Sequence, residues 1–135
     1  MSGAQPNTVL IVDDHATIRF LLRTLVEKAG FIVCAEAPDG AKAIEEAKRT
    51  RPDLILLDLV MPTLDGVEAA SALKELMPQV PIILFTLHDD GIGRSFAKTL
   101  GVVDMIMAKS DGMTKLVPYM RTLLHLAERE RGELC

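Results

Sequence analysis

Residues 54–58 read Leu54-Ile55-Leu56-Leu57-Asp58, so a carboxylate directly follows four aliphatic side chains. An unbroken aliphatic run of this length is typical of a strand that is buried on both faces of a parallel sheet. Four other apolar runs along the chain have a similar length and composition. We therefore predict five strands, at residues 8–12, 31–35, 53–57, 81–85 and 102–108.

Aliphatic residues at helical spacing separate these runs. From Ile18 to Val26 they stand at positions i, i+3, i+4, i+7 and i+8, and the pattern stops at Gly30. This spacing predicts one apolar helical face and a glycine that ends the helix. Weaker patterns of the same kind predict further helices at about residues 43–47, 65–77, 92–100 and 114–127.

Two of these helices carry signals for where they begin. Asp65 and Glu68 are a candidate capping box for the third helix. Pro118 places the start of the last helix near Thr114, because proline is tolerated only in the first turn. The alternation of strands and helices predicts an α/β fold, with a parallel sheet and helices on both of its faces.

Length and composition limit the classes of protein to consider. A chain of 135 residues fits one domain, and we predict a flexible lead-in at 1–7, the domain at 8–128 and a tail at 129–135. The net charge of −4 argues against direct binding of nucleic acid. No apolar stretch has the length of a membrane span. The start does not resemble a signal peptide, and the two cysteines form no disulfide framework, so we expect a cytoplasmic protein.

Polar residues follow four of the predicted strands. Asp13 and Asp14 follow the first strand, Asp58 the third, Thr86 the fourth and Lys109 the fifth. In a parallel sheet these strand ends share one edge, where ligands bind at the topological switch point. We therefore expect three carboxylates, a hydroxyl and an ammonium to meet in one shallow cleft.

That combination has a specific chemistry. Three neighbouring carboxylates repel one another unless a cation binds, and oxygen-only ligands favour a hard cation such as Mg²⁺. Lys109 supplies a compact positive charge for a phosphoryl oxygen, and Thr86 can donate a hydrogen bond to another. A carboxylate beside Mg²⁺ can act as a nucleophile and form an acyl phosphate. Asp58 is the candidate nucleophile.

Four motifs, in order and at matching spacing, resemble the response-regulator receiver domain of two-component signalling over about residues 8 to 128. They are residues 9–15, residues 54–62 with Asp65-Gly66, residues 81–86, and Lys109. The resemblance implies a flavodoxin-like, doubly wound (βα)5 sandwich whose parallel five-stranded sheet has the order 2-1-3-4-5. The Asp13-Asp14-His15 motif of this chain most resembles the corresponding motif of receivers that are attached to helix-turn-helix regulators.

The resemblance also implies a role for each matching residue. Asp58 would be the phosphorylated residue, and Thr86 and Lys109 would hold the phosphoryl group. Mg²⁺ would be held by the carboxylates of Asp13, Asp14 and Asp58 and by the backbone carbonyl of Val60. The backbone amides of Val60 and Leu87 would assist.

The resemblance extends to partners. The phosphoryl donor would be a histidine kinase or a histidine phosphotransfer protein. The phosphorylated chain would bind a downstream effector protein through a two-state surface, without contacting nucleic acid or membrane itself, and it could form a weak homodimer. Such a chain accepts a phosphoryl group and is not a turnover enzyme.

Two positions depart from the family pattern. Receivers usually carry Tyr or Phe three residues before the lysine, where this chain has Ile106, and proline after it, where this chain has Ser110. The acceptor site is unaffected by either change. The usual coupled movement of the threonine and an aromatic ring cannot operate in the same way with Ile106.

Several alternatives stay open. Asp13 and Asp14 could cap the first helix, and His15 or His88 could be a ligand or proton carrier, although imidazole suits softer metals. A phosphohydrolase would need a general acid at Val60. A module that no longer uses phosphate, or a fragment of a longer DNA-binding transcription regulator, would fit the same residues.

Overall fold

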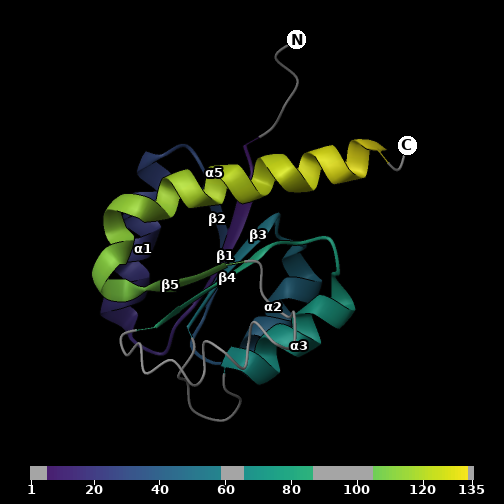
Figure 1. Cartoon of the computed structure of the whole chain (residues 1–135). Helices are drawn as coiled ribbons and strands as arrows, with labels where there is room; N and C mark the ends of the chain where they lie inside the picture. The colour runs from purple at the N-terminus through teal and green to yellow at the C-terminus, as the bar shows by residue number, and fades with distance from the viewer. Residues whose placement is uncertain (1–5, 59–65, 87–104, 134–135) are drawn as a thin grey trace.

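The computed structural model describes residues 6–58, 66–86 and 105–133, with side chains for 6–58, 66–85 and 115–129. Its five strands form one sheet in the order β2-β1-β3-β4-β5, and every neighbouring pair is parallel. Figure 1 shows this sheet at the centre of the molecule with helices on both sides. The predicted flavodoxin-like architecture and strand order are thus confirmed. The strands are β1 Thr8–Val12, β2 Ile32–Ala37, β3 Leu54–Asp58, β4 Ile82–Thr86 and β5 Met105–Ala108.

Strand β3 lies in the middle of the sheet because it pairs with β1 on one side and with β4 on the other. All five of its residues are buried. Its unbroken aliphatic run therefore has the predicted cause, since residues on both faces of this strand contact hydrophobic layers rather than water. The strand ends one residue later than predicted, so that Asp58 is its last residue.

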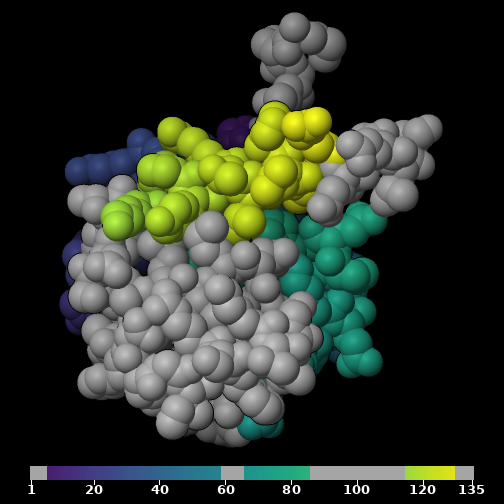
Figure 2. All heavy atoms as spheres, viewed as in Figure 1, coloured from purple at the N-terminus to yellow at the C-terminus, as the bar shows by residue number. Residues whose placement is uncertain are grey.

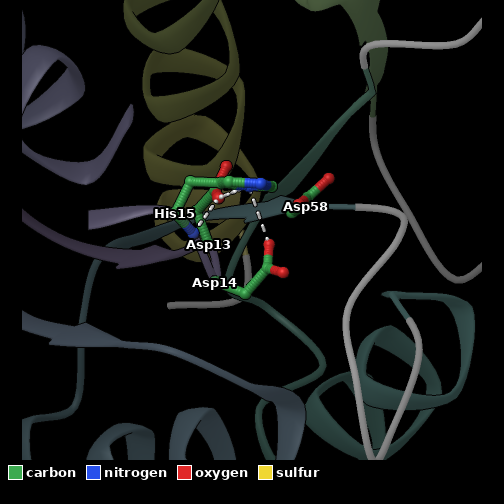
Figure 3. A group of neighbouring side chains, drawn as sticks. All are labelled: Asp13, Asp14, His15 and Asp58. Atoms are coloured by element: carbon green, nitrogen blue, oxygen red, sulfur yellow. Dashed lines mark hydrogen bonds and ion pairs between the residues drawn. The ribbon is translucent and has the colours of Figure 1, made fainter. Parts of the chain in front are cut away.

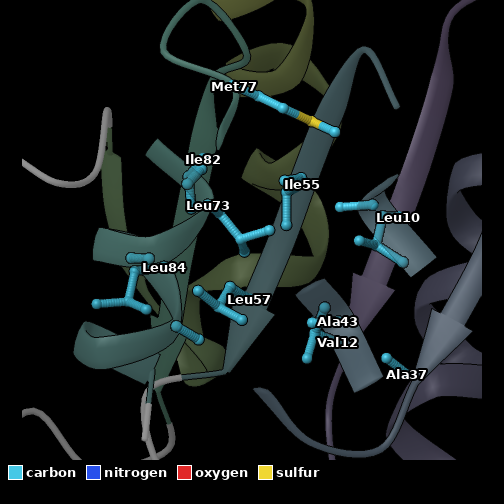
Figure 4. Close-up of a cluster of buried hydrophobic side chains, with 13 residues drawn as sticks. Leu10, Val12, Ala37, Ala43, Ile55, Leu57, Leu73, Met77, Ile82 and Leu84 are labelled. Atoms are coloured by element: carbon cyan, nitrogen blue, oxygen red, sulfur yellow. The ribbon is translucent and has the colours of Figure 1, made fainter. Parts of the chain in front are cut away.

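Helices α1 Ala16–Lys28 and α5 Lys109–Glu133 cover one face of the sheet, and α2 Gly40–Thr50 and α3 Gly66–Leu76 cover the other. Alternate residues of the strands supply the two hydrophobic layers. The layer under α2 and α3 includes Leu10, Ile55 and Leu57 (Figure 4). The layer under α1 and α5 includes Val9, Ile11, Leu54 and Leu56. The pleat of each central strand thus sorts its side chains between two cores.

The ends of α1 and α2 follow the local sequence. Helix α1 ends two residues before Gly30, which has a φ of 97°, the left-handed conformation that glycine adopts without strain. Helix α2 begins after Asp39, whose carboxylate accepts a hydrogen bond of 2.8 Å from the backbone N–H of Lys42. This bond satisfies one of the free amides of the first turn.

The predicted start of the last helix was wrong. Helix α5 begins at Lys109 rather than near Thr114, and Pro118 lies inside it. A proline in a helix interior costs about 3 kcal/mol. Burial of Leu116, Met120 and Leu124 against the sheet offsets this cost, because each buried side chain of this size contributes about 1.5–3 kcal/mol.

Helix α5 bends in its first half (Figure 1), as expected where proline removes a backbone hydrogen bond. Figure 2 shows the rest of the helix lying along the surface, where Leu126 is 49% exposed. Asp65 of the predicted capping box and the predicted helix at residues 92–100 lie outside the described residues. Within the described part of the chain, no helix combines the length and apolarity needed to cross a membrane.

Replacing Leu73 tests the packing of α3 on the sheet. Leu73 is fully buried in the layer under α2 and α3. Leu73→Ala is expected to lower the free energy of unfolding by about 2–5 kcal/mol, because it leaves a cavity in a close-packed layer. Leu126→Ala on the exposed side of α5 is the matched control, with an expected change of about 0.5 kcal/mol or less. Urea denaturation measures both, and equal losses would contradict the assigned burial.

Candidate functional site

Two buried carboxylates lie at the carboxyl-terminal edge of the sheet. Asp13 directly follows β1 and is 0% exposed, and Asp58 ends β3 and is 3% exposed. Because Val12 pairs with Leu57, the next residues of the two strands, Asp13 and Asp58, reach the edge side by side. Among the described residues they are the two buried polar or charged groups. Burying like charges together is unfavourable unless hydrogen bonds or a cation compensate.

The carboxylate of Asp14 and the imidazole of His15 join this pair. Asp13, Asp14, His15 and Asp58 each offer one ligand atom, and these atoms all lie within 4.8 Å of one another (Figure 3). Ligand atoms about 2.1 Å from one octahedral cation are roughly 3–4 Å apart. The group therefore needs only small side-chain movements to surround a single ion. Its three carboxylates have the donor chemistry that Mg²⁺ prefers, so the residues present fit this cation.

His15 is the residue that the sequence placed near the cleft without a defined role. Its backbone N–H donates a 2.8 Å hydrogen bond to Oδ1 of Asp13. Its Nδ1 lies 3.3 Å from the same oxygen and 3.0 Å from Oδ1 of Asp14. The imidazole is 60% exposed, so it lies at the open side of the group. The structure thus brings His15 within ligand distance, while His88 lies outside the described residues.

The alternative that Asp13 and Asp14 cap α1 does not match the helix start. His15 occupies the N-cap position and its side chain makes no capping hydrogen bond. The carboxylate of Asp13 accepts from the N–H of His15, which precedes the first turn. Both aspartates therefore stand before the cap position.

The other predicted site residues are located only by their backbone. Thr86 is the last residue of β4 and pairs with Ala108 of β5, after which Lys109 begins α5. Asp58 pairs with Phe85, the neighbour of Thr86. The backbones of Thr86 and Lys109 therefore reach the same edge of the sheet as Asp58. Val60 and Leu87 lie outside the described residues.

Sequence reasoning missed Arg19, which contacts the backbone of this site, and Glu36, which contacts Arg19. Nη1 of Arg19 on α1 donates a 2.6 Å hydrogen bond to the carbonyl of Asp13, and Nε of Arg19 lies 3.2 Å from Oε1 of Glu36 on β2. Arg23 also binds Glu36, and this hydrogen bond raises the pKa of Arg23. The signal available in the sequence was the presence of two arginines on the predicted first helix and a glutamate at the end of the second strand, which could form ion pairs.

A shallow cavity of about 250 Å³ lies elsewhere, lined by residues that include Asn7, Gly30, Phe31, Arg121 and Leu124. Its residues precede β1 and β2 or belong to α5, so it faces the opposite edge of the sheet. Arg121 is already engaged there, donating 3.0 Å to the carbonyl of Ala29 and lying 5.9 Å from the ring centre of Phe31. This cavity does not contribute to the carboxylate group.

Comparisons with known proteins agree with this geometry. The family model described as the response regulator receiver domain matches residues 9–120. Chemotaxis protein CheY of Bacillus subtilis is 42% identical over 76 residues, which cover 56% of this chain and 63% of CheY. The alkaline phosphatase synthesis transcriptional regulatory protein PhoP of Bacillus subtilis is 36% identical over 107 residues, which cover 79% of this chain and 41% of PhoP. The chain thus spans less than two thirds of these relatives.

Solved structures show the same fold. A CheY-like receiver domain protein from Methanospirillum hungatei superimposes with a TM-score of 0.86 at 21% identity, over 93% of this chain and 99% of that one. A LuxR family two-component response regulator from Aurantimonas superimposes with a TM-score of 0.83 at 29% identity, over 90% of this chain and 86% of that one. The match to the family model over residues 9–120 establishes that the chain belongs to the response regulator receiver domain family.

Proposed function

We propose that this receiver accepts a phosphoryl group on Asp58 from a phosphohistidine donor in a Mg²⁺-dependent reaction. The observation that carries the proposal is the convergence of Asp13, Asp14 and Asp58 at one strand edge, with ligand atoms within 4.8 Å. Asp58 ends the central strand, is 3% exposed and pairs with Phe85 of β4, so its backbone is held within the sheet. A fixed nucleophile in a cation-binding group suits in-line phosphoryl transfer.

In this reaction an oxygen of the Asp58 carboxylate attacks the phosphorus of phosphohistidine. The P–N bond breaks, and the imidazole nitrogen leaves with the bonding electrons and is protonated from solvent, which leaves an acyl phosphate on Asp58. Bound Mg²⁺ would neutralise charge on the carboxylates and on a phosphoryl oxygen. The side chains of Asp13 and Asp14 and the carbonyl of Val60 would complete the metal site with Asp58.

The remaining site residues would hold the transferred group. Thr86 would donate its hydroxyl to one phosphoryl oxygen, and the ammonium of Lys109 would neutralise another. Backbone amides of Val60 and Leu87 would add hydrogen bonds. The positions of Thr86 and Lys109 at the ends of β4 and β5 support these roles, because both strands end at the Asp58 edge.

The donor would be a histidine kinase or a histidine phosphotransfer protein in the cytoplasm, and the product would be a signal rather than a released compound. Phosphorylation would bias a two-state surface near β5 and α5 that binds an effector protein. The chain would thus act as a phosphoacceptor that assists its own phosphorylation and dephosphorylation.

Two alternatives have specific support. Ile106, in place of the usual aromatic residue, suits a module that binds its partner without phosphate. The relative PhoP is a transcriptional regulatory protein of which the match covers 41%, so the chain could correspond to the receiver part of a longer DNA-binding regulator. In that case the receiver still would not contact DNA itself.

Incubation with acetyl phosphate and Mg²⁺ tests the acceptor role. Wild-type protein is expected to gain the mass of one phosphoryl group, because the Asp58 carboxylate reacts with a small phosphoryl donor as it does with phosphohistidine. Asp58→Asn removes the nucleophilic oxygen and is expected to gain no mass under the same conditions.

Intact-protein mass spectrometry makes this measurement, with EDTA as the metal-free control. Beryllofluoride plus Mg²⁺ provides a second test that needs no covalent step, followed by changes in backbone amide NMR signals near Asp58. Wild-type protein that responds to neither reagent supports the phosphate-independent module. An equal mass gain in Asp58→Asn would show that another residue accepts the phosphoryl group.

Divalent cation should also stabilise the fold. At Mg²⁺ concentrations tenfold above Kd, binding to the native state is expected to add about 1.4 kcal/mol to the free energy of unfolding, seen as a higher Tm. Asp13→Asn is expected to abolish most of this shift. Asp39→Asn is the matched control, because it removes one carboxylate from the helix cap of α2 and leaves an equally good cap.

Circular dichroism melts at constant ionic strength, with and without MgCl₂, make the comparison. The Asp39→Asn variant should respond like wild type. A Mg²⁺ shift that survives in Asp13→Asn would show that the cation binds elsewhere.

A further inference from the structure

The backbone of Asp13 is held on both sides by residues outside the carboxylate group. Its N–H donates a 3.0 Å hydrogen bond to the carbonyl of Ala37 on β2. Its carbonyl accepts a 2.6 Å hydrogen bond from Nη1 of Arg19 on α1. The first bond continues the pairing of β1 with β2, but the second comes from a side chain. The direction of the peptide that joins Asp13 to Asp14 therefore depends on where the Arg19 guanidinium is held.

A carboxylate fixes that guanidinium. Nε of Arg19 lies 3.2 Å from Oε1 of Glu36, and Glu36 is the strand neighbour of Ala37. The contacts close a ring from Asp13 through Arg19, Glu36 and Ala37 back to Asp13, and this ring joins β1, α1 and β2. Both charged side chains are largely shielded, with 20% and 28% exposed. An arginine that bonds two partners at once through different nitrogens has little freedom to move.

Arg23 offers a natural comparison within the same cluster. It lies one helical turn beyond Arg19, and its Nη1 binds the other oxygen of Glu36 at 2.6 Å. Its Nε also lies 3.4 Å from Glu27 on the same helix. Arg23 therefore shares the charge, the helix and the carboxylate partner of Arg19, but its Cα lies about 6 Å further along α1. The hydrogen bond to the Asp13 carbonyl comes from Arg19.

We propose that Arg19 is a positioning residue for the acidic site. This proposal rests on the function proposed above for that site. By holding the Asp13 carbonyl, Arg19 fixes the turn between β1 and α1 that presents the carboxylates of Asp13 and Asp14 to Asp58. Glu36 acts through Arg19 by holding its guanidinium. Neither residue belongs to the group of ligand atoms, which comes from Asp13, Asp14, His15 and Asp58.

The sign of the effect separates positioning from simple electrostatics. Removing the positive charge of Arg19, and leaving Glu36 negative, makes the surroundings of the carboxylates more negative. By Coulomb's law alone this change would tighten the binding of a cation. Loss of positioning acts in the opposite direction, because carboxylates that must be ordered on binding have lower affinity. A weaker cation affinity in the variant can therefore be assigned to geometry.

Mg²⁺ titration of Arg19→Ala and Arg23→Ala tests the proposal, with Kd measured from backbone amide NMR shifts. The Kd of Arg19→Ala is expected to rise at least about tenfold, the range seen when residues that orient metal ligands are replaced. Arg23→Ala is expected to stay within about twofold of wild type, because it removes an equal charge and an equal ion pair without a contact to Asp13. The Kd of Arg19→Lys should lie between those of wild type and Arg19→Ala, because one ammonium cannot reproduce both contacts of the guanidinium.

A second measurement needs no metal. Hydrogen exchange of the Asp13 amide, in metal-free protein, should be faster in Arg19→Ala than in Arg23→Ala. Arg19 anchors the next peptide along the chain, so its loss should ease local opening of the hydrogen bond between the Asp13 N–H and Ala37. Glu36→Gln leaves α1 unchanged and should raise the exchange rate by a smaller factor, because Arg19 loses its charged partner but keeps its contact to Asp13. It keeps the proposal testable if Arg19→Ala does not fold.

The outcomes distinguish this proposal from the function on which it rests. If wild-type protein shows no Mg²⁺ binding, the proposed metal site and the positioning role both fail. If wild type binds Mg²⁺ but Arg19→Ala binds it equally well or more tightly, only the positioning role is overturned. Equal weakening in Arg19→Ala and Arg23→Ala would also overturn it, since a general loss of α1 packing would then explain the result.

Discussion

The register of β1 against β3 is the constraint on which the rest of this structure depends. Val12 lies opposite Leu57, and this pairing brings Asp13 and Asp58 to the same edge of the sheet. A slip of one residue would turn every side chain of a strand to the opposite face. The two aliphatic layers, under α2 and α3 and under α1 and α5, exclude such a slip. The carboxylates therefore owe their proximity to aliphatic packing, since their own charges drive them apart.

This arrangement places an unfavourable charge cluster on a stable framework. Two of its carboxylates are buried, and like charges at this depth oppose folding unless they are compensated. Such local conflicts are expected where function needs them. The ring that joins Asp13, Arg19 and Glu36 contacts the backbone of Asp13 rather than its carboxylate.

Family membership and the choice of output depend on different parts of the chain. The receiver match covers residues 9–120, which include the first part of α5 and all of the sheet except Thr8. Ile106 lies in β5 opposite Leu84, at the position where receivers usually have an aromatic ring. Under the proposed function, a readout in this protein cannot rely on a ring that moves. Helix α5 begins at Lys109, directly after β5, so it runs from the edge of the sheet that carries the site along the surface of the molecule.

Local patterns were sufficient for much of this protein. Aliphatic runs, helical spacing and the residues that follow each strand predicted the parallel sheet and the meeting of Asp13, Asp14 and Asp58, because periodicity and strand ends are properties of neighbouring residues. The order of the strands was predicted only from the resemblance to receivers. The start of α5 could not be predicted this way, since burial on the sheet outweighs the preference of Pro118. Only the tertiary structure decided that Arg19 meets Glu36, 17 residues away, and the carbonyl of Asp13. Those contacts depend on the rotation of α1 over the β1–β2 pair, which is set by packing rather than by any local sequence.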